Sequence, residues 1–281
     1  MKINVWGARG SIPVSGRDYV DFGGDTTCLQ LDAESGETIV LDAGTGIRRL
    51  GAEIASDPAR FGPLHLLLTH AHWDHIMGFP FFRPVYRKNV TIRVHGCTNA
   101  QESIRLFLEE AMHPPFFPVP LDRVAANLFF AGRCDMVFDI GSVRVGTFPL
   151  NHPNGGFGFR FTEGERSFAF FPDYELMLDH PGGRPYGDLV EFIKDVDLLI
   201  FDAEYLREEY EKTRGFGHSV YEDTVRLAKD AGADRLMLWH LNQDRTDGGV
   251  RAMVENAREL ASEGGGGPEV EAASTGLSAS L

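Results

Sequence analysis

A dense group of potential metal ligands follows the largely apolar run Leu64–Leu68. Three imidazoles and one carboxylate fall within six residues, at His70, His72, Asp74 and His75. The run is typical of a buried strand, so the polar group begins where that strand ends. Each of these groups would destabilise the fold by roughly 1–3 kcal/mol if it were buried without a partner. A pair of divalent ions offers a partner to all four, because neutral imidazole and carboxylate suit zinc-like ions.

The spacing within this group divides it into two halves. Side chains two residues apart point to the same side of an extended chain, so His70 and His72 can bind one ion together. Asp74 and His75 follow a turn, where a helix is expected to begin, and can reach a second ion on the other side. Solvated or core histidines are the alternative interpretation, but four such groups in six residues fit a metal centre better.

The pattern His-x-His-x-Asp-His after a hydrophobic strand resembles the signature of the metallo-β-lactamase fold superfamily, a group of hydrolases. Four further segments resemble motifs of that family in the same order along the chain: Leu41–Gly46, Asn151–Pro153, Phe171–Asp173 and Leu238–His240. The resemblance implies an α+β fold built as a four-layer αββα sandwich. We expect one metallo-hydrolase domain over residues 1–263, followed by a Gly-rich, flexible C-terminal tail over residues 264–281.

The resemblance also implies a ligand set. One ion would be held by three histidines and the other by two histidines and a carboxylate: His70, His72 and His152 for the first, and Asp74, His75 and His240 for the second. Asp173 would bridge the two ions, and Asp202, at the end of another predicted strand, is the alternative bridging residue. Asp42 would hold the histidine loop by hydrogen bonds rather than bind metal.

Two more segments, Asp202–Tyr205 and Gly217–Ser219, resemble the branch of the superfamily that contains ribonuclease Z and small phosphodiesterases. In that branch a carboxylate supports a histidine that acts on the leaving group. The resemblance therefore implies that His218 is a general acid and that Asp202 is its orienting partner.

The expected mechanism follows from two ions about 3.5–4 Å apart, which can share a bridging hydroxide and so generate a nucleophile at neutral pH. We expect Asp74 to bind metal and to accept a hydrogen bond from this nucleophile. His218 would then give the departing alkoxide its proton. Zinc is the favoured metal, because His72 stands where diiron relatives have a glutamate, and manganese is the alternative.

The chain departs from tRNA-processing members of that branch at residues 153–172, which contain no long Gly/Pro-rich basic arm. Its 41 acidic side chains exceed the 27 basic ones, which gives a formal charge of −14 at pH 7. Proteins that bind a phosphate backbone normally present a basic face, so a small anionic substrate is favoured over a long nucleic acid. A local basic patch is an alternative that the overall charge does not exclude. It would be formed by Arg48, Arg49, Arg83, Arg87, Lys88 and Arg93.

These features favour a dinuclear-metal phosphodiesterase that cleaves a small phosphodiester, such as a cyclic nucleotide or a nucleotide derivative. The alternatives are a ribonuclease Z-like RNA hydrolase and a hydrolase of a carboxylic ester, thioester or lactam. A metal-holding domain without turnover is a further alternative, which the complete ligand set and the additional His/Asp pair disfavour. Relatives in this branch commonly pair, so a homodimer is an option here.

The rest of the sequence predicts the elements around these motifs. Helices are expected at residues 47–55, 101–112, 219–231 and 250–261. Ser219 and Glu222 have the spacing of a capping box for the third of these helices. Period-two alternation over residues 138–171 predicts a second set of strands. The proline-rich loop 113–120 is expected to be a structural cover, with a hydrophobic wall over the metal pocket as the functional alternative, and residues 270–277 could add an edge strand.

The cysteines and the termini bear on location. Cys28, Cys97 and Cys134 have no metal-type spacing and an odd count, as free thiols in a reducing compartment do. Residues 1–6 enter a strand pattern at once and show no secretory apolar region. No run reaches the roughly 18 apolar residues that a membrane span needs. A soluble, cytoplasmic protein without membrane contact is therefore expected.

Overall fold

The computed structural model describes residues 1–96, 104–132 and 136–281, and in these residues the strands form two seven-stranded sheets. The first sheet has the strand order β14-β1-β2-β3-β4-β5-β6. Its strands are β1 (Lys2–Gly7), β2 (Cys28–Asp32), β3 (Thr38–Leu41), β4 (Leu64–Leu67), β5 (Thr91–Gly96), β6 (Asn127–Gly132) and β14 (Ser278–Ser280). Strands β3 to β6 run parallel to one another, whereas the pairs β14–β1, β1–β2 and β2–β3 are antiparallel.

The second sheet mirrors this arrangement, with the order β13-β12-β11-β10-β9-β8-β7. Its strands are β7 (Val137–Ile140), β8 (Val143–Pro149), β9 (Phe157–Glu163), β10 (Arg166–Phe171), β11 (Leu198–Asp202), β12 (Arg235–Trp239) and β13 (Glu269–Ala272). Strands β10 to β13 are parallel, and the meander β7-β8-β9-β10 is antiparallel. The predicted strands over residues 138–171 are therefore present.

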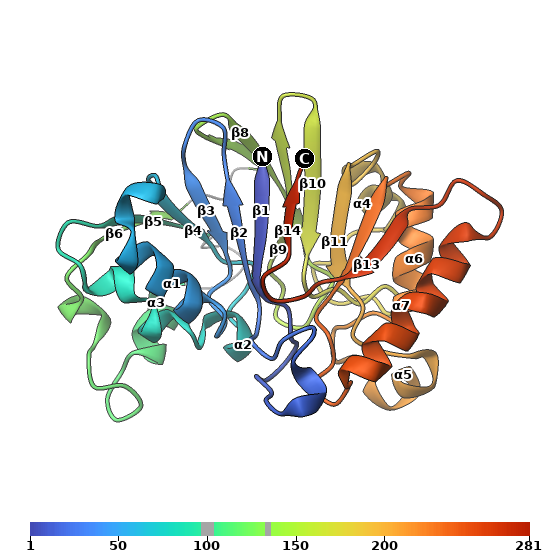
Figure 1. Cartoon of the computed structure of the whole chain (residues 1–281), viewed down its shortest axis with the longest axis horizontal. Helices are drawn as coiled ribbons and strands as arrows, with labels where there is room; N and C mark the ends of the chain where they lie inside the picture. Colours follow the sequence, from blue (N-terminus) through green and yellow to red (C-terminus); the bar gives the residue numbers. More distant parts are fainter. Residues whose placement is uncertain (97–103, 133–135) are drawn as a thin grey trace.

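Helices cover the outer face of each sheet (Figure 1). The α-helices are α1 (Ile47–Ser56), α2 (Trp73–Ile76), α3 (Ile104–Ala111), α4 (Tyr186–Phe192), α5 (Arg207–Thr213), α6 (Tyr221–Asp230) and α7 (Asp247–Ser262). Short 3-10 turns occupy residues 17–19, 58–60, 79–81, 83–86 and 121–123. Helices α1 and α3 lie on the first sheet, and α4, α6 and α7 on the second.

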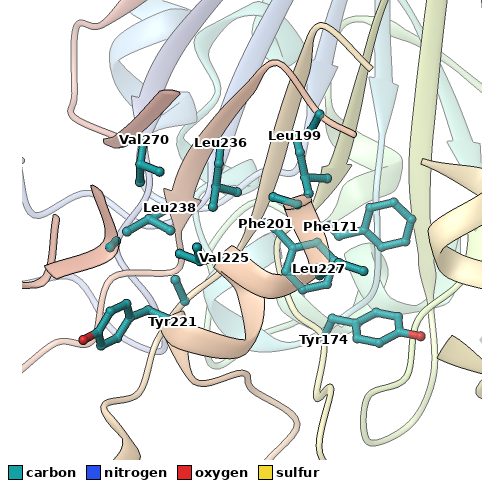
Figure 2. Packing of buried hydrophobic residues seen from close by; sticks show 14 of the residues in the cluster. Phe171, Tyr174, Leu199, Phe201, Tyr221, Val225, Leu227, Leu236, Leu238 and Val270 are labelled. Atoms are coloured by element: carbon teal, nitrogen blue, oxygen red, sulfur yellow. The ribbon is translucent and has the colours of Figure 1, made fainter. Parts of the chain in front are cut away.

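Three apolar layers hold the four structural layers together. Between the sheets, Leu31 and Ile3 of the first sheet and Phe161, Phe168 and Trp239 of the second belong to one buried cluster. Separate clusters lie under the helices of each sheet, and Figure 2 shows how the side chains of α6 pack on the second sheet. Burial on both faces explains the near-continuous apolar runs of the central parallel strands. The expectation of an αββα sandwich is confirmed.

The C-terminal segment corrects the expectation of a flexible tail. Strand β13 extends the second sheet, where Val270 is buried, and β14 pairs with β1 through the partners Ala279 and Ile3. Residues 269–281 thus take part in both sheets, and the sandwich reaches beyond residue 263. The chain crosses from one sheet to the other over Ala273, which is fully buried in the cluster between the sheets.

Two smaller expectations can be compared with the structure. Helix α6 begins after Val220, and the Ser219 hydroxyl donates to the Tyr174 carbonyl instead of forming a capping box. The ring of Phe117 in loop 113–120 meets Phe81 edge-on at 5.6 Å, whereas Phe116 is 84% exposed.

Other expectations fall partly outside the described residues. Cys28 is a buried free thiol, and Cys97 and Cys134 lie outside the described residues, as do residues 101–103 of one predicted helix. Among the helices of the described ranges, none combines the length and apolarity needed to cross a bilayer.

Candidate metal and proton-transfer site

The predicted ligands all lie at the ends of strands along one edge of the two sheets. His70 and His72 follow β4, and α2 then begins at once and carries Asp74 and His75. His152 follows β8, Asp173 follows β10 and His240 follows β12. The strands β8, β10 and β12 run in the same direction, since β8 and β10 are separated only by the antiparallel β9. Their carboxyl ends therefore meet at one edge.

Four side chains form the first group that could hold a metal ion: His70, His72, His152 and Asp173. One ligand atom of each lies within 4.8 Å of the others. The His152 Nε2 and His72 Nδ1 atoms are 2.9 Å apart, and His70 Nε2 is 3.5 Å from Asp173 Oδ2. The three histidines thus aim one ring nitrogen each at a common point.

The second group consists of Asp74, His75 and His240, all buried. Asp74 Oδ2 lies 3.4 Å from His75 Nε2 and 3.2 Å from His240 Nε2. The backbone N–H of Ser11 also donates to Asp74 Oδ2, at 3.0 Å. The N-terminal loop therefore reaches the site, and Gly10 lies so close to His240 that a Cβ atom there would be 2.2 Å from the ring.

Asp173 lies between the two groups. Its carboxylate is 3.0 Å from His75 Nε2, 3.4 Å from His240 Nε2 and 3.6 Å from His152 Nε2. Asp202 belongs to none of the groups and instead accepts hydrogen bonds from the backbone N–H of Tyr174 and Glu204. Of the two candidate bridging residues, Asp173 has the suitable position.

Each histidine of the two groups is held through the nitrogen that faces away from the cluster. The contacts are His70 Nδ1 with Thr69 Oγ1 (3.0 Å), His75 Nδ1 with Asp42 (2.8 Å), His152 Nδ1 with the Gly217 carbonyl (2.7 Å), His240 Nδ1 with Glu204 (3.0 Å) and His72 Nε2 with the Asn154 amide (3.2 Å). The oxygen partners of His70, His75, His152 and His240 can accept a ring N–H and so fix the ring orientation and the tautomer of a metal-binding histidine, whereas the Asn154 amide nitrogen is a donor and fixes only the position of the His72 ring. Asp42 also accepts from the backbone N–H and the hydroxyl of Thr69, so it holds the histidine loop.

The cluster fits divalent metal ions. His70 Nε2, His75 Nε2 and Asp173 Oδ1 are buried and have no partner with hydrogen-bond geometry within the described residues, although the last two lie 3.0 Å apart. Buried polar atoms are normally satisfied, so three such atoms converging on one place need a further partner. Imidazole nitrogens and carboxylate oxygens are the donor set that zinc and related ions prefer.

The electrostatics of the histidines in the cluster agree with a bound metal ion. Burial lowers the pKa of His152 to about 3 and that of His70 well below its usual value, so both are neutral, as a metal ligand must be. Burial would also lower the pKa of His240, but Asp173, Asp74 and Glu204 raise it well above its usual value. The carboxylates thus favour a positive charge at this buried position. A metal ion can supply that charge instead of a proton.

His218 lies beside the second group, between two carboxylates. Its Nδ1 is 2.7 Å from Asp202 Oδ2, its Nε2 is 3.3 Å from Glu204 Oε2, and its ring stacks on His240 at 4.3 Å. Burial alone would lower the pKa of His218, but Glu204 and Asp202 together raise it to about 9. The two carboxylates thus favour the protonated imidazole, which suits a proton donor.

Residues 37–241 match the family described as the beta-lactamase superfamily domain. The chain belongs to this family. Its curated relatives include ribonuclease Z of Porphyromonas gingivalis, 24% identical over 265 residues (79% of this chain and 84% of the relative), and ribonuclease Z of Haloferax volcanii, 23% identical over 304 residues (92% and 90%).

Solved structures with the same fold include three proteins that this β-lactamase superfamily member matches over nearly its whole length. The metallo-β-lactamase fold protein YhfI from Bacillus subtilis has a TM-score of 0.71 at 19% identity, with 99% of each chain covered. Yeast PDE1 has a TM-score of 0.70 at 14% identity (100% and 99% covered), and a diphosphatase of the PhnP family has 0.69 at 15% (100% and 97%). The expectation of a metallo-β-lactamase fold hydrolase related to ribonuclease Z is confirmed.

Sequence reasoning missed one carboxylate of this superfamily member's site. Glu204 contacts both His218 and His240, and it also accepts from the Asn242 amide at 2.9 Å. A signal was available, because Asp202 and Glu204 are two residues apart at a strand end and so point to the same side.

Proposed function

We propose that this chain is a metal-dependent phosphodiesterase that cleaves a small phosphodiester with His218 as its general acid. The observation that carries the proposal is the position of His218. The imidazole is held by Asp202 at 2.7 Å and lies 4.0 Å from Asp173, which belongs to the metal-holding cluster. A charged, oriented imidazole at that place is what the departure of a poorly stabilised alkoxide requires.

In this proposal the cluster holds two divalent ions, which we take to be zinc, with manganese as the alternative. The ligands are His70, His72 and His152 for one ion and Asp74, His75 and His240 for the other, with Asp173 between them. When bound, such ions supply a water-derived nucleophile at neutral pH and positive charge for the phosphoryl oxygens.

The side chains around the reacting phosphorus would then have separate roles in nucleophilic attack and in protonation of the leaving group. Asp74, fixed by the Ser11 N–H, accepts a hydrogen bond from the attacking water as well as binding metal. Asp202 accepts a hydrogen bond from the Nδ1–H of His218, so that the proton on Nε2 is the one given to the leaving oxygen. Glu204 accepts from the Nε2–H of His218 until the leaving oxygen replaces Glu204 as the acceptor.

A small substrate is favoured by charge and by shape. The formal charge of −14 opposes a long polyanion, since counterion release by basic residues supplies much of the affinity for nucleic acid. Residues 153–172, between His152 and Asp173, form the β9–β10 hairpin and the turn before it rather than a long basic RNA-binding arm. The similarity to yeast PDE1 and to a PhnP-family diphosphatase supports the same choice.

Hydrolysis of RNA is the second candidate function. The curated relatives named above are ribonucleases Z, and they cover most of this chain. This function would use the same cluster and the same proton donor on a larger substrate.

The test is a substrate panel for the zinc-loaded protein with cyclic nucleotides, p-nitrophenyl phosphodiesters, a precursor tRNA, a thioester and a lactam. We expect phosphodiesters to be cleaved, and His218→Ala to slow diesters with poor leaving groups by about 10²–10⁴ while p-nitrophenyl diesters lose far less. Equal losses on both substrates would remove the acid role. Cleavage of the tRNA alone would favour the second candidate, and cleavage of the thioester or the lactam alone would contradict both.

We also propose a cytoplasmic location, for which the buried free thiol of Cys28 is the supporting observation.

A further inference from the structure

Glu175 is a fully buried carboxylate that accepts four hydrogen bonds. Its Oε1 accepts from the Tyr210 hydroxyl at 2.6 Å and from the Gly215 N–H at 2.8 Å. Its Oε2 accepts from the Gly217 N–H at 2.9 Å and from His180 Nε2 at 2.6 Å. The proposed reaction as described so far makes no use of this side chain, although its four donors satisfy the usual capacity of a carboxylate.

Two of the four donors belong to the loop that carries His218. Gly215 and Gly217 have φ angles of +89° and +99°, a conformation that L residues rarely adopt. A short segment with two such glycines has many alternative conformations, and the two bonds to Glu175 select one of them. In that conformation the Gly217 carbonyl accepts from His152 Nδ1 at 2.7 Å, and His218 meets Asp202.

The backbone of Glu175 is anchored to the segments that carry the ligands. Its N–H donates to the Asn151 carbonyl at 2.9 Å, and the Asn151 side-chain amide donates back to the Glu175 carbonyl at 2.5 Å. The flanking residues are tied to Ser219, whose hydroxyl donates to Tyr174 O and accepts from Leu176 N. Glu175 therefore joins the segments of His152, Asp173 and His218.

We propose that Glu175 is a positioning residue that sets, through the Gly215–His218 loop, both the orientation of His152 and the reach of His218 toward the leaving group. The side-chain hydrogen bonds of Glu175 go to none of the metal-holding atoms. Its effect on His152 is independent of which ester is cleaved, whereas its effect on His218 rests on the proposed function.

The test compares Glu175→Gln with a matched control. Gln keeps the size of the side chain but turns one acceptor into a donor that faces two other donors. Glu163→Gln is the control, because Glu163 is also buried, accepts from Glu34 N and the Ser142 hydroxyl, and lies at the far end of β9, about 20 Å from the site edge. Tyr210→Phe removes one of the four donors and keeps the ring, so it supplies a variant that folds if Glu175→Gln does not.

The first measurement is zinc retention during titration with a chelator, which needs no substrate. We expect Glu175→Gln to lose zinc at about tenfold lower chelator concentration than the wild type, because displaced outer partners weaken metal binding by about 10–100-fold. Tyr210→Phe should shift in the same direction by less, and Glu163→Gln should not shift. Retention in Glu175→Gln and Tyr210→Phe equal to that in the control would overturn the role toward His152.

The second measurement is the ratio of kcat for diesters with good and with poor leaving groups. In the zinc-saturated protein, Glu175→Gln should raise this ratio at least about tenfold with little change in KM, because impaired proton donation slows the diesters with poor leaving groups most. Added to His218→Ala, it should raise the ratio no further. A further rise in that double variant, or no rise in the single one, would overturn the role toward His218. If the wild type cleaves no phosphodiester, the proposed function fails, while zinc retention still tests Glu175.

Discussion

Gly217 is a residue whose replacement should disturb the site directly. A Cβ atom at this position would lie 2.1 Å from His152 Nδ1, and the φ angle of +99° already disfavours any other residue. We expect Gly217→Ala to lower activity and zinc affinity by about 10–100-fold, because His152 must move.

Gly215→Ala separates this displacement from simple backbone strain. Gly215 has a similar φ of +89°, but a Cβ atom there would contact only Leu178, at 3.7 Å. Both variants should lower the free energy of unfolding by about 1–3 kcal/mol, as strained backbone does. Urea unfolding and zinc titration of the two proteins check this, and similar zinc affinities in both would refute the displacement of His152.

At the scale of elements, the neighbouring parallel strands β4 and β5 are linked by a pair of buried histidines that belong to neither metal-holding group. His65 Nδ1 lies 2.9 Å from His95 Nε2, and the rings stack at 5.1 Å. Burial, with a smaller contribution from the charge of Arg93, lowers the pKa of His65 to about 4.

This pair predicts a loss of stability in acid. A histidine whose pKa is about 4 when folded and about 6.5 when unfolded binds more protons in the unfolded chain between these values. Its contribution to stability is therefore full above about pH 6.5 and disappears as the pH falls toward 4. The unfolding midpoint should drop less between pH 7.5 and pH 5 in His65→Gln than in the wild type at equal zinc loading. An identical drop in both, or the same reduction on changing the exposed His113, would contradict this.

The elements also show which features of the fold and the site the sequence patterns predict and which they do not. The ligand motifs were predictable because each is a short polar group directly after an apolar strand, and strand ends of one sheet meet at one edge. Strands β13 and β14 have only four and three residues, too few for a clear period-two signal, and the glycines before them suggested disorder. The edge strand offered for residues 270–277 is present in part, as β13 at the edge of the second sheet. Their order comes from pairing with distant strands. Glu175 was likewise invisible, because two of its donors stand 40 and 42 residues away in the sequence.

At the scale of the whole molecule, the two sheets converge on one site from opposite halves of the chain. The first sheet supplies the His70–His75 loop, and the second supplies His152, Asp173 and His240. Each of the two groups described above takes ligands from both halves, so these two groups exist only when both sheets pack on the cluster between them. Metal binding and the packing of the sandwich should therefore stabilise each other.

The most direct test of this account is elemental analysis of the purified chain together with His152→Ala and His240→Ala. Because each histidine belongs to a different group, we predict about two divalent ions per chain in the wild type and about one in each variant. A wild-type chain that binds no metal when supplied with zinc, or variants that keep both ions, would contradict it.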